Sequence, residues 1–151
     1  MIIRKKFVLM ALCLVCQTAM AESAVISKSS LVAEGSPGEG ALDNFNPVVT
    51  ATSPISGSED IDTNTKEIRV TFSQEMMTDR MWSVVNLDGV RFPEVVGQVR
   101  YANDNKTFVI PVKLQKDTVY ALGFNSEKHQ GFKSKFGKVA ESYTLVFKTK
   151  G

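Results

Sequence analysis

The chain has 151 residues, with 18 Lys or Arg, 16 Asp or Glu and a formal net charge of +2 at pH 7. Three of the basic residues lie within the first 21 positions, so the remainder carries 15 basic against 16 acidic side chains. This balance excludes the global basic field typical of nucleic-acid-binding proteins, and we expect no nucleic acid partner. Both cysteines, Cys13 and Cys16, also lie in this first segment. The rest of the chain must therefore be held by an apolar core without disulfides.

The first 21 residues have the pattern of a secretory signal peptide. A basic stretch at 4–6 precedes an apolar run at 7–15, and Ala19 and Ala21 fit the small-x-small rule for cleavage. We therefore predict a signal peptide over residues 1–21 that is cleaved after Ala21. The apolar run is too short to span a bilayer, and we expect no transmembrane segment after cleavage. The predicted location is the periplasm, the medium or the cell surface.

Residues 22–47 are predicted to form a flexible linker. They are rich in Ser, Gly, Glu, Ala and Pro and show no sustained hydrophobic periodicity. Two short apolar clusters, at 24–26 and 31–33, interrupt this composition. They are either incidental or able to dock on a partner.

From residue 48 to residue 151 the chain is predicted to form one all-β domain. Short apolar stretches are separated by turn signals at intervals of about 8–15 residues, which is typical of all-β folds. The first strand, at 48–53, is expected at a sheet edge because Pro54 ends it. The second, at 67–72, alternates apolar and polar residues, so one of its faces is expected in the core.

The middle of the domain contains a strong turn signal. Asp88-Gly89 is a preferred hairpin dipeptide, so we predict a hairpin between strands at 83–87 and 90–92. A further strand at 94–101 would place Val95, Val99 and Tyr101 on one face.

Three more strands complete the predicted domain. They are expected at 107–112 with Phe108 and Ile110 inward, at 118–125 with Tyr120, Leu122 and Phe124 inward, and at 143–149 with Leu145 and Phe147 inward. This number and spacing of strands, without an amphipathic helix, predicts an antiparallel β-sandwich of about seven strands in two sheets.

A family resemblance supports this architecture. The residues that carry its first motif are Pro54, Gly57, Ile61 and Asn64, followed by Phe72-Ser73-x-x-Met76. This pattern resembles the start of the bacterial Ig-like domains found in surface-layer proteins, although Glu75 stands where the family often has Pro. The ending Tyr143-x-x-x-Phe147-x-Thr149 is similar to the closing strand of that family. The resemblance implies an Ig-like sandwich over about 48–150, with Met76 plugging its core.

One acidic loop invites a calcium hypothesis. Asp60, Asp62 and Asn64 stand at alternate positions with Glu59 beside them, and calcium loops use alternating oxygen ligands of this kind. However, Thr65 stands where such a loop has Gly, and no bidentate Glu follows at the twelfth position. A turn in which Asp and Asn bond their own backbone explains the same residues.

Methionines and the single histidine invite a copper hypothesis. Thioethers and imidazole suit copper, and the candidate ligands are Met76, Met77, Met81 and His129. The competing interpretation is that the methionines fill irregular core space.

The connection at 126–142 is longer than most loops and is the preferred binding surface. Its basic and aromatic residues are Lys128, His129, Phe132, Lys133, Lys135, Phe136 and Lys138. Such a set could grip an anionic envelope polymer. Alternatively Phe132 and Phe136 tuck over the end of the sandwich while the lysines stay solvated. The resemblance favours this second interpretation, because Asn125, Ser126, Phe132 and Gly137 match a recurring connection of some family members.

Little in the sequence points to an enzyme. No cysteine follows position 21, and His129 has no nucleophile elbow near it. Carboxylate pairs that meet across strands leave no sequence pattern and stay open. We therefore predict a non-enzymatic module without cofactors. Its expected partner is an envelope or surface protein or an anionic envelope polymer; the alternative is a periplasmic copper- or calcium-binding protein.

Overall fold

The computed structural model describes residues 40–79 and 81–151. The predicted signal peptide and most of the predicted linker lie outside these residues. The described part is all-β, and its strands are β1 (Val49–Ser53), β2 (Glu67–Phe72), β3 (Val84–Asn86), β4 (Glu94–Val95), β5 (Arg100–Tyr101), β6 (Thr107–Lys113), β7 (Val119–Phe124) and β8 (Tyr143–Lys148). None of the described residues belongs to a helix that could cross a membrane.

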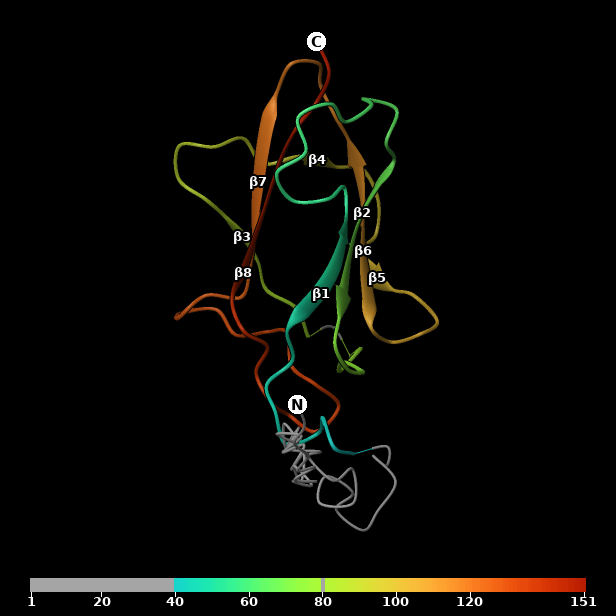
Figure 1. The fold of residues 1–151 in the computed structure, drawn as a ribbon, viewed down its shortest axis with the longest axis vertical. Helices are drawn as coiled ribbons and strands as arrows, with labels where there is room; N and C mark the ends of the chain where they lie inside the picture. The colour runs from blue at the N-terminus through green and yellow to red at the C-terminus, as the bar shows by residue number, and fades with distance from the viewer. Residues whose placement is uncertain (1–39, 80) are drawn as a thin grey trace, which may run out of the picture. The chain divides into compact units, whose positions relative to one another are not determined.

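The strands form two antiparallel sheets that face each other (Figure 1). In the larger sheet β1 pairs with β2 and β2 with β6, while β4 and β5 both pair with β6 on its other side. In the smaller sheet β7 lies between β3 and β8. The predicted all-β sandwich is confirmed. Its two flanks are the edges β1 and β8 on one side, and the edges β3 and β4–β5 on the other.

The core lies between the sheets and follows the predicted alternation. Inward residues of β2, β6, β7 and β8 are buried, among them Ile68, Phe108, Tyr120, Leu122 and Phe147. This burial is the main stabilising term of a sandwich without disulfides, at about 1.5–3 kcal/mol for each fully buried large apolar side chain.

The predicted hairpin around Asp88-Gly89 is wrong. The two residues do form a turn, in which Val90 N–H donates to Leu87 O at 3.4 Å. However, β3 pairs with β7, and Arg91 forms an isolated parallel bridge with Tyr120. Turn chemistry is local, whereas an isolated hairpin buries little apolar surface. Pairing with β7 instead packs Val84 against the core.

The predicted strand at 94–101 is split into β4 and β5, and Pro111 in β6 explains the break. Val112 N–H donates to Lys66 O on the β2 side, so the position of the missing Pro111 N–H faces β4 and β5. Pro111 O still accepts from Val96 N–H at 3.0 Å. The ladder therefore stops at Val96 and resumes at Arg100.

The last residues of the predicted linker contact the sandwich. Gln74 Nε2 donates to Leu42 O at 3.1 Å and to Phe45 O at 2.9 Å. Glu141 N–H donates to Pro47 O at 2.8 Å. The packed structure therefore begins before residue 48, the boundary that the change in amino-acid composition predicts.

Candidate functional site

The edge of β8 is covered by the chain's own segment 56–61. Gly57 N–H donates to Val146 O at 2.7 Å, and Lys148 N–H donates to Ser58 O at 2.7 Å. Ile61 N–H donates to Lys148 O at 3.1 Å. The outward main-chain groups of Val146 and Lys148 on β8 are therefore occupied, whereas the edge β1 on the same flank borders a hollow of about 560 Å³.

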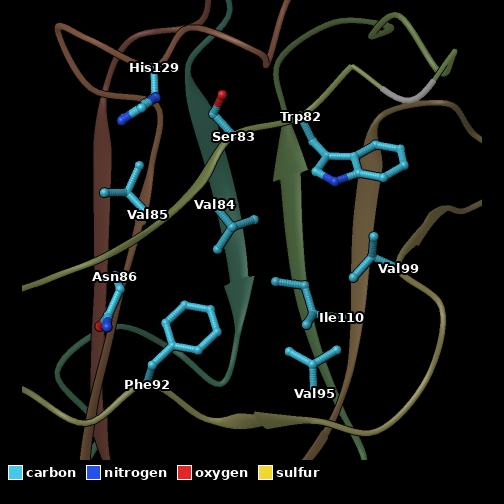
Figure 2. A pocket seen from close by; sticks show the side chains of 10 residues that line it. All are labelled: Trp82, Ser83, Val84, Val85, Asn86, Phe92, Val95, Val99, Ile110 and His129. Atoms are coloured by element: carbon cyan, nitrogen blue, oxygen red, sulfur yellow. The ribbon is translucent and has the colours of Figure 1, made fainter.

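The opposite flank, between β3 and β4–β5, contains a cleft of about 440 Å³. Figure 2 shows side chains from both sheets pointing into it. Its apolar lining includes Trp82, Val84, Phe92, Val95, Val99 and Ile110. Ser83, Asn86 and His129 contribute the polar groups at its margin. A cleft that is mostly apolar with a few polar groups is typical of a binding site.

The outer edge of β3 borders this cleft with its main chain exposed. Asn125 N–H donates to Ser83 O at 3.0 Å, so Ser83 and Val85 form the hydrogen-bonded pairs with β7. Alternation of an antiparallel ladder then turns the N–H and C=O groups of Val84 and Asn86 outward. Among residues 40–79 and 81–151, no hydrogen-bond partner occupies these outward groups.

Aromatic side chains support the wall of the cleft. The Trp82 ring centroid lies 5.7 Å from that of Phe108, and Phe108 in turn lies 5.2 Å from Tyr101. The Tyr101 hydroxyl donates to Met81 O at 3.5 Å. Burial raises the pKa of Tyr101, so its hydroxyl stays protonated and can keep donating across the physiological range.

Gly131 fixes the backbone at the end of the cleft. A Cβ at this position would overlap the Trp82 carbonyl group, so no larger residue fits without a shift. Gly131 N–H also donates to Ser83 Oγ at 2.8 Å. The connection at 126–142 is thereby held against the segment that carries Trp82.

Phe132 is predicted on the binding surface, but its side chain is buried in the core. Its side chain is 0% exposed, and its ring lies 5.2 Å from Phe72 and 5.0 Å from Phe108 between centroids. Apolar burial therefore outweighs the polar neighbourhood of this residue in the sequence. Asn125 anchors the connection, because its side chain donates to Phe132 O and Ala140 O and accepts from Phe132 N–H, at 2.9–3.0 Å.

The remaining residues of the predicted surface do not share one hollow. Lys128 and Lys138 are exposed, and Lys133 is half-buried. His129 lines the apolar cleft, whereas Lys135 and Phe136 line a separate hollow of about 780 Å³.

Lys135 is already engaged within the chain. Its ammonium pairs with the Glu75 carboxylate at 3.1 Å and lies 5.1 Å from the centre of the Phe136 ring. This contact leaves less positive charge free for an anionic polymer than the sequence indicates.

The metal hypotheses gain no support from the geometry. Asn64 N–H donates to Asp62 Oδ1 at 2.7 Å, which is the local turn that also explains this loop. Met76 is 3% exposed and packs in the core, whereas His129 is exposed. Within the part of the chain that the structure describes, no three His, Cys, Asp or Glu residues are grouped to hold a metal ion.

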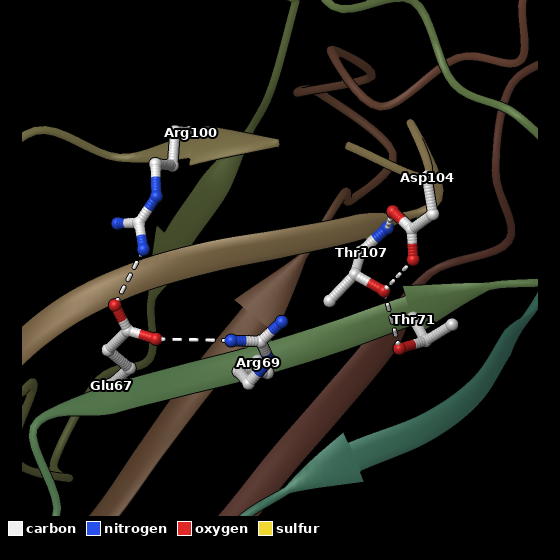
Figure 3. Close-up of polar contacts among 6 residues, drawn as sticks. All are labelled: Glu67, Arg69, Thr71, Arg100, Asp104 and Thr107. Atoms are coloured by element: carbon white, nitrogen blue, oxygen red, sulfur yellow. Dashed lines mark hydrogen bonds and ion pairs between the residues drawn. The ribbon is translucent and has the colours of Figure 1, made fainter. Parts of the chain in front are cut away.

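Polar side chains on the outer face of the larger sheet stabilise the strands (Figure 3). Glu67 pairs with Arg100 at 2.7 Å and with Arg69 at 3.2 Å. The pKa of Glu67 is lowered, mainly by the hydrogen bond from Arg100. These ion pairs are exposed, and such pairs contribute at most about 1 kcal/mol each.

The turn between β5 and β6 is closed by Asp104. Its carboxylate accepts from Thr107 Oγ1 at 2.7 Å and from the N–H groups of Lys106 and Thr107 at 2.9 Å. Thr107 Oγ1 lies 3.0 Å from Thr71 Oγ1 on β2.

Comparison with known proteins identifies the domain. The bacterial Ig-like domain family matches residues 43–149. The chain belongs to this family. The Ig-like match begins five residues before the predicted domain boundary, in the segment whose carbonyl groups accept from Gln74 and Glu141. No curated protein sequence matches the chain.

Two solved structures similar to this Ig-like chain are of surface-layer proteins. The S-layer protein rSbsC(31-844) is 18% identical over 70% of the chain, with a TM-score of 0.45. Domains 1-6 of surface layer protein SbsC are 19% identical over 72% of the chain, with a TM-score of 0.46. The chain covers 14% of each of these proteins.

Sequence reasoning missed the apolar cleft of this Ig-like domain. Two signals mark it in retrospect: the short strand that contains Val84, and Pro111, which interrupts the strand beside β6. Neither signal says that Trp82 and Val99 face each other, because that depends on how the two sheets are stacked.

Proposed function

We propose that the chain is an exported, non-catalytic Ig-like module that binds another protein of the cell envelope or cell surface. The observation that carries the proposal is the difference between the two edge strands of the smaller sheet, β8 and β3. The edge of β8 is covered by the chain's own segment 56–61, whereas the edge of β3 lies free beside an apolar cleft. Export is supported by the predicted signal peptide at 1–21.

The chemistry of the cleft favours binding over catalysis. His129 is the titratable residue of its lining, and the other polar contributors are Ser83 and Asn86. Ser83 Oγ already accepts a hydrogen bond from Gly131 N–H. A nucleophile oriented by a base and a third group, as acyl-transfer enzymes need, is not present among these lining residues.

The test is capture of partners from envelope extract of the host organism. The purified, exported protein would be the bait, beside a variant with Lys128, Lys133, Lys135 and Lys138 changed to Ser. We expect the same envelope protein to be enriched by both baits, because the cleft is intact in both. Absence of any specific partner would contradict the proposal. Loss of the partner in the Lys-to-Ser variant would instead assign binding to the basic connection at 126–142.

A further inference from the structure

We infer that the cleft accepts an extended strand of the partner protein, which pairs with the free edge of β3 and places alternate apolar side chains between the two sheets. This inference rests on the proposed function and names the kind of partner segment that the cleft fits.

The first observation behind the inference is the spacing of free main-chain groups. Val84 and Asn86 are two residues apart, and both turn N–H and C=O groups toward the cleft. An extended chain presents matching groups at the same two-residue period. A compact small molecule or a helix would leave these groups without partners, which is costly once water is excluded.

The second observation is the apolar character of the space beside that edge. A strand added to β3 would continue the smaller sheet, so every second side chain would point toward the larger sheet. There it would meet Trp82, Val95, Val99 and Ile110, which line the side of the cleft formed by the larger sheet and the segment before β3 (Figure 2). The occupant is therefore a strand with apolar residues at alternate positions.

The third observation is that the facing edge is interrupted. Pro111 keeps β4 and β5 apart, and Val96 N–H is used on Pro111 O. The longest uninterrupted edge at this flank is therefore β3, with three residues, and the broken edge opposite leaves room for the side chains of the added strand.

The test uses Trp82, the single tryptophan of the sequence, as an internal reporter. The probe is a synthetic peptide, acetyl-Lys-Val-Ser-Val-Ser-Val-Lys-amide, titrated into the purified, exported protein. We expect saturable binding with a shift of Trp82 emission to shorter wavelength, because the added valines exclude water from the indole. A peptide with the same residues in the order Lys-Ser-Ser-Val-Val-Val-Lys should bind at least about tenfold more weakly, as should an N-methylated probe that cannot donate two of its hydrogen bonds.

Two neighbouring valines supply matched variants. Val95 lines the cleft and is 42% exposed, whereas Val96 is 54% exposed and does not line it. Val95→Lys should weaken probe binding at least about tenfold, because a charge would enter the apolar space, while Val96→Lys should leave it unchanged. Both positions are exposed enough for the fold to persist, which circular dichroism would check.

Equal binding of the alternating and rearranged peptides, or equal effects of the two variants, would overturn the inference. Sedimentation that shows a dimer unable to bind the probe would also overturn it, in favour of a second copy as the occupant. Capture of an envelope partner equally by Val95→Lys and wild type would leave the proposed function standing without the inference. Probe binding by the wild type, with no partner captured from envelope extract, would leave the inference about the cleft standing and contradict the proposed function.

Discussion

The two edge strands of the smaller sheet, β8 and β3, differ in what their outward main-chain groups contact. An edge strand presents unused N–H and C=O groups that can pair with another chain. At β8 these groups bond to the segment 56–61 of the same chain. At β3 the outward groups of Val84 and Asn86 face an apolar cleft. The contrast shows that the edge of β8 is closed within the domain, whereas the edge of β3 is left open.

The open flank is expected to depend most on Phe132, which packs on Phe108 and thereby supports Trp82. Phe132→Ala should lower the free energy of unfolding by about 3–5 kcal/mol, because it leaves a cavity at a fully buried position. Urea denaturation followed by Trp82 fluorescence would measure this loss. Phe136→Ala is the control, since Phe136 is 54% exposed and its removal should cost less than about 1 kcal/mol. Similar losses in both variants would contradict the placement of Phe132.

The covered edge of β8 can be opened at Gly57, whose φ of 86° disfavours any residue with a side chain. Gly57→Ala should cost about 1–2 kcal/mol, and hydrogen exchange of the Lys148 amide should accelerate, because that amide donates to Ser58 O. Gly89→Ala is matched, since Gly89 has a φ of 78° and an equally open surrounding. Gly89→Ala should lower the free energy of unfolding by a similar amount. It should not speed exchange of the Lys148 amide beyond what this lower global stability causes. Equal exchange in the two variants would show that segment 56–61 does not cover β8.

The smallest expected effect concerns the turn that joins β5 to β6 beside the open flank. Hydrogen bonds from the Thr107 side chain and main chain lower the pKa of Asp104. The stabilisation is therefore complete above the pKa of the unfolded chain, about 3.9, and is lost as the pH falls through the lower pKa of the folded state.

Thermal unfolding between pH 5 and pH 2 would measure this loss in wild type and in Asp104→Ala. We expect the wild type to lose up to about 1 kcal/mol more than the variant over this range, a small difference because the carboxylate is exposed. Glu67 and Asp117 also have lowered pKa values, and both proteins retain them. Parallel pH profiles for the two proteins would contradict the role of Asp104.

The fold could be predicted from the sequence where burial has a simple period. Ile68, Val70 and Phe72 alternate with polar residues, and the structure buries all three. Strand pairing was harder, because the Asp88-Gly89 turn fixes the local bend but not the strand that Val84 joins. That choice depends on the apolar face of β7, which is more than 30 residues away in the sequence.

The candidate site could not be predicted for a similar reason. The basic residues around Phe132 indicate an exposed surface by composition, yet the Asn125 side chain donates to Phe132 O and accepts from Phe132 N–H, which holds the main chain of Phe132 inward. The cleft arises from residues of both sheets, and only their stacking brings Trp82 and Val99 to the same space.

Pro111 also affects how readily copies of the protein aggregate at high concentration. An uninterrupted edge at β4 and β5 would offer a long template on which copies could stack into a growing sheet. The proline divides that edge into strands of two residues each, too short to propagate such stacking. This edge of the larger sheet is therefore a poor template for stacking, although it borders the open cleft.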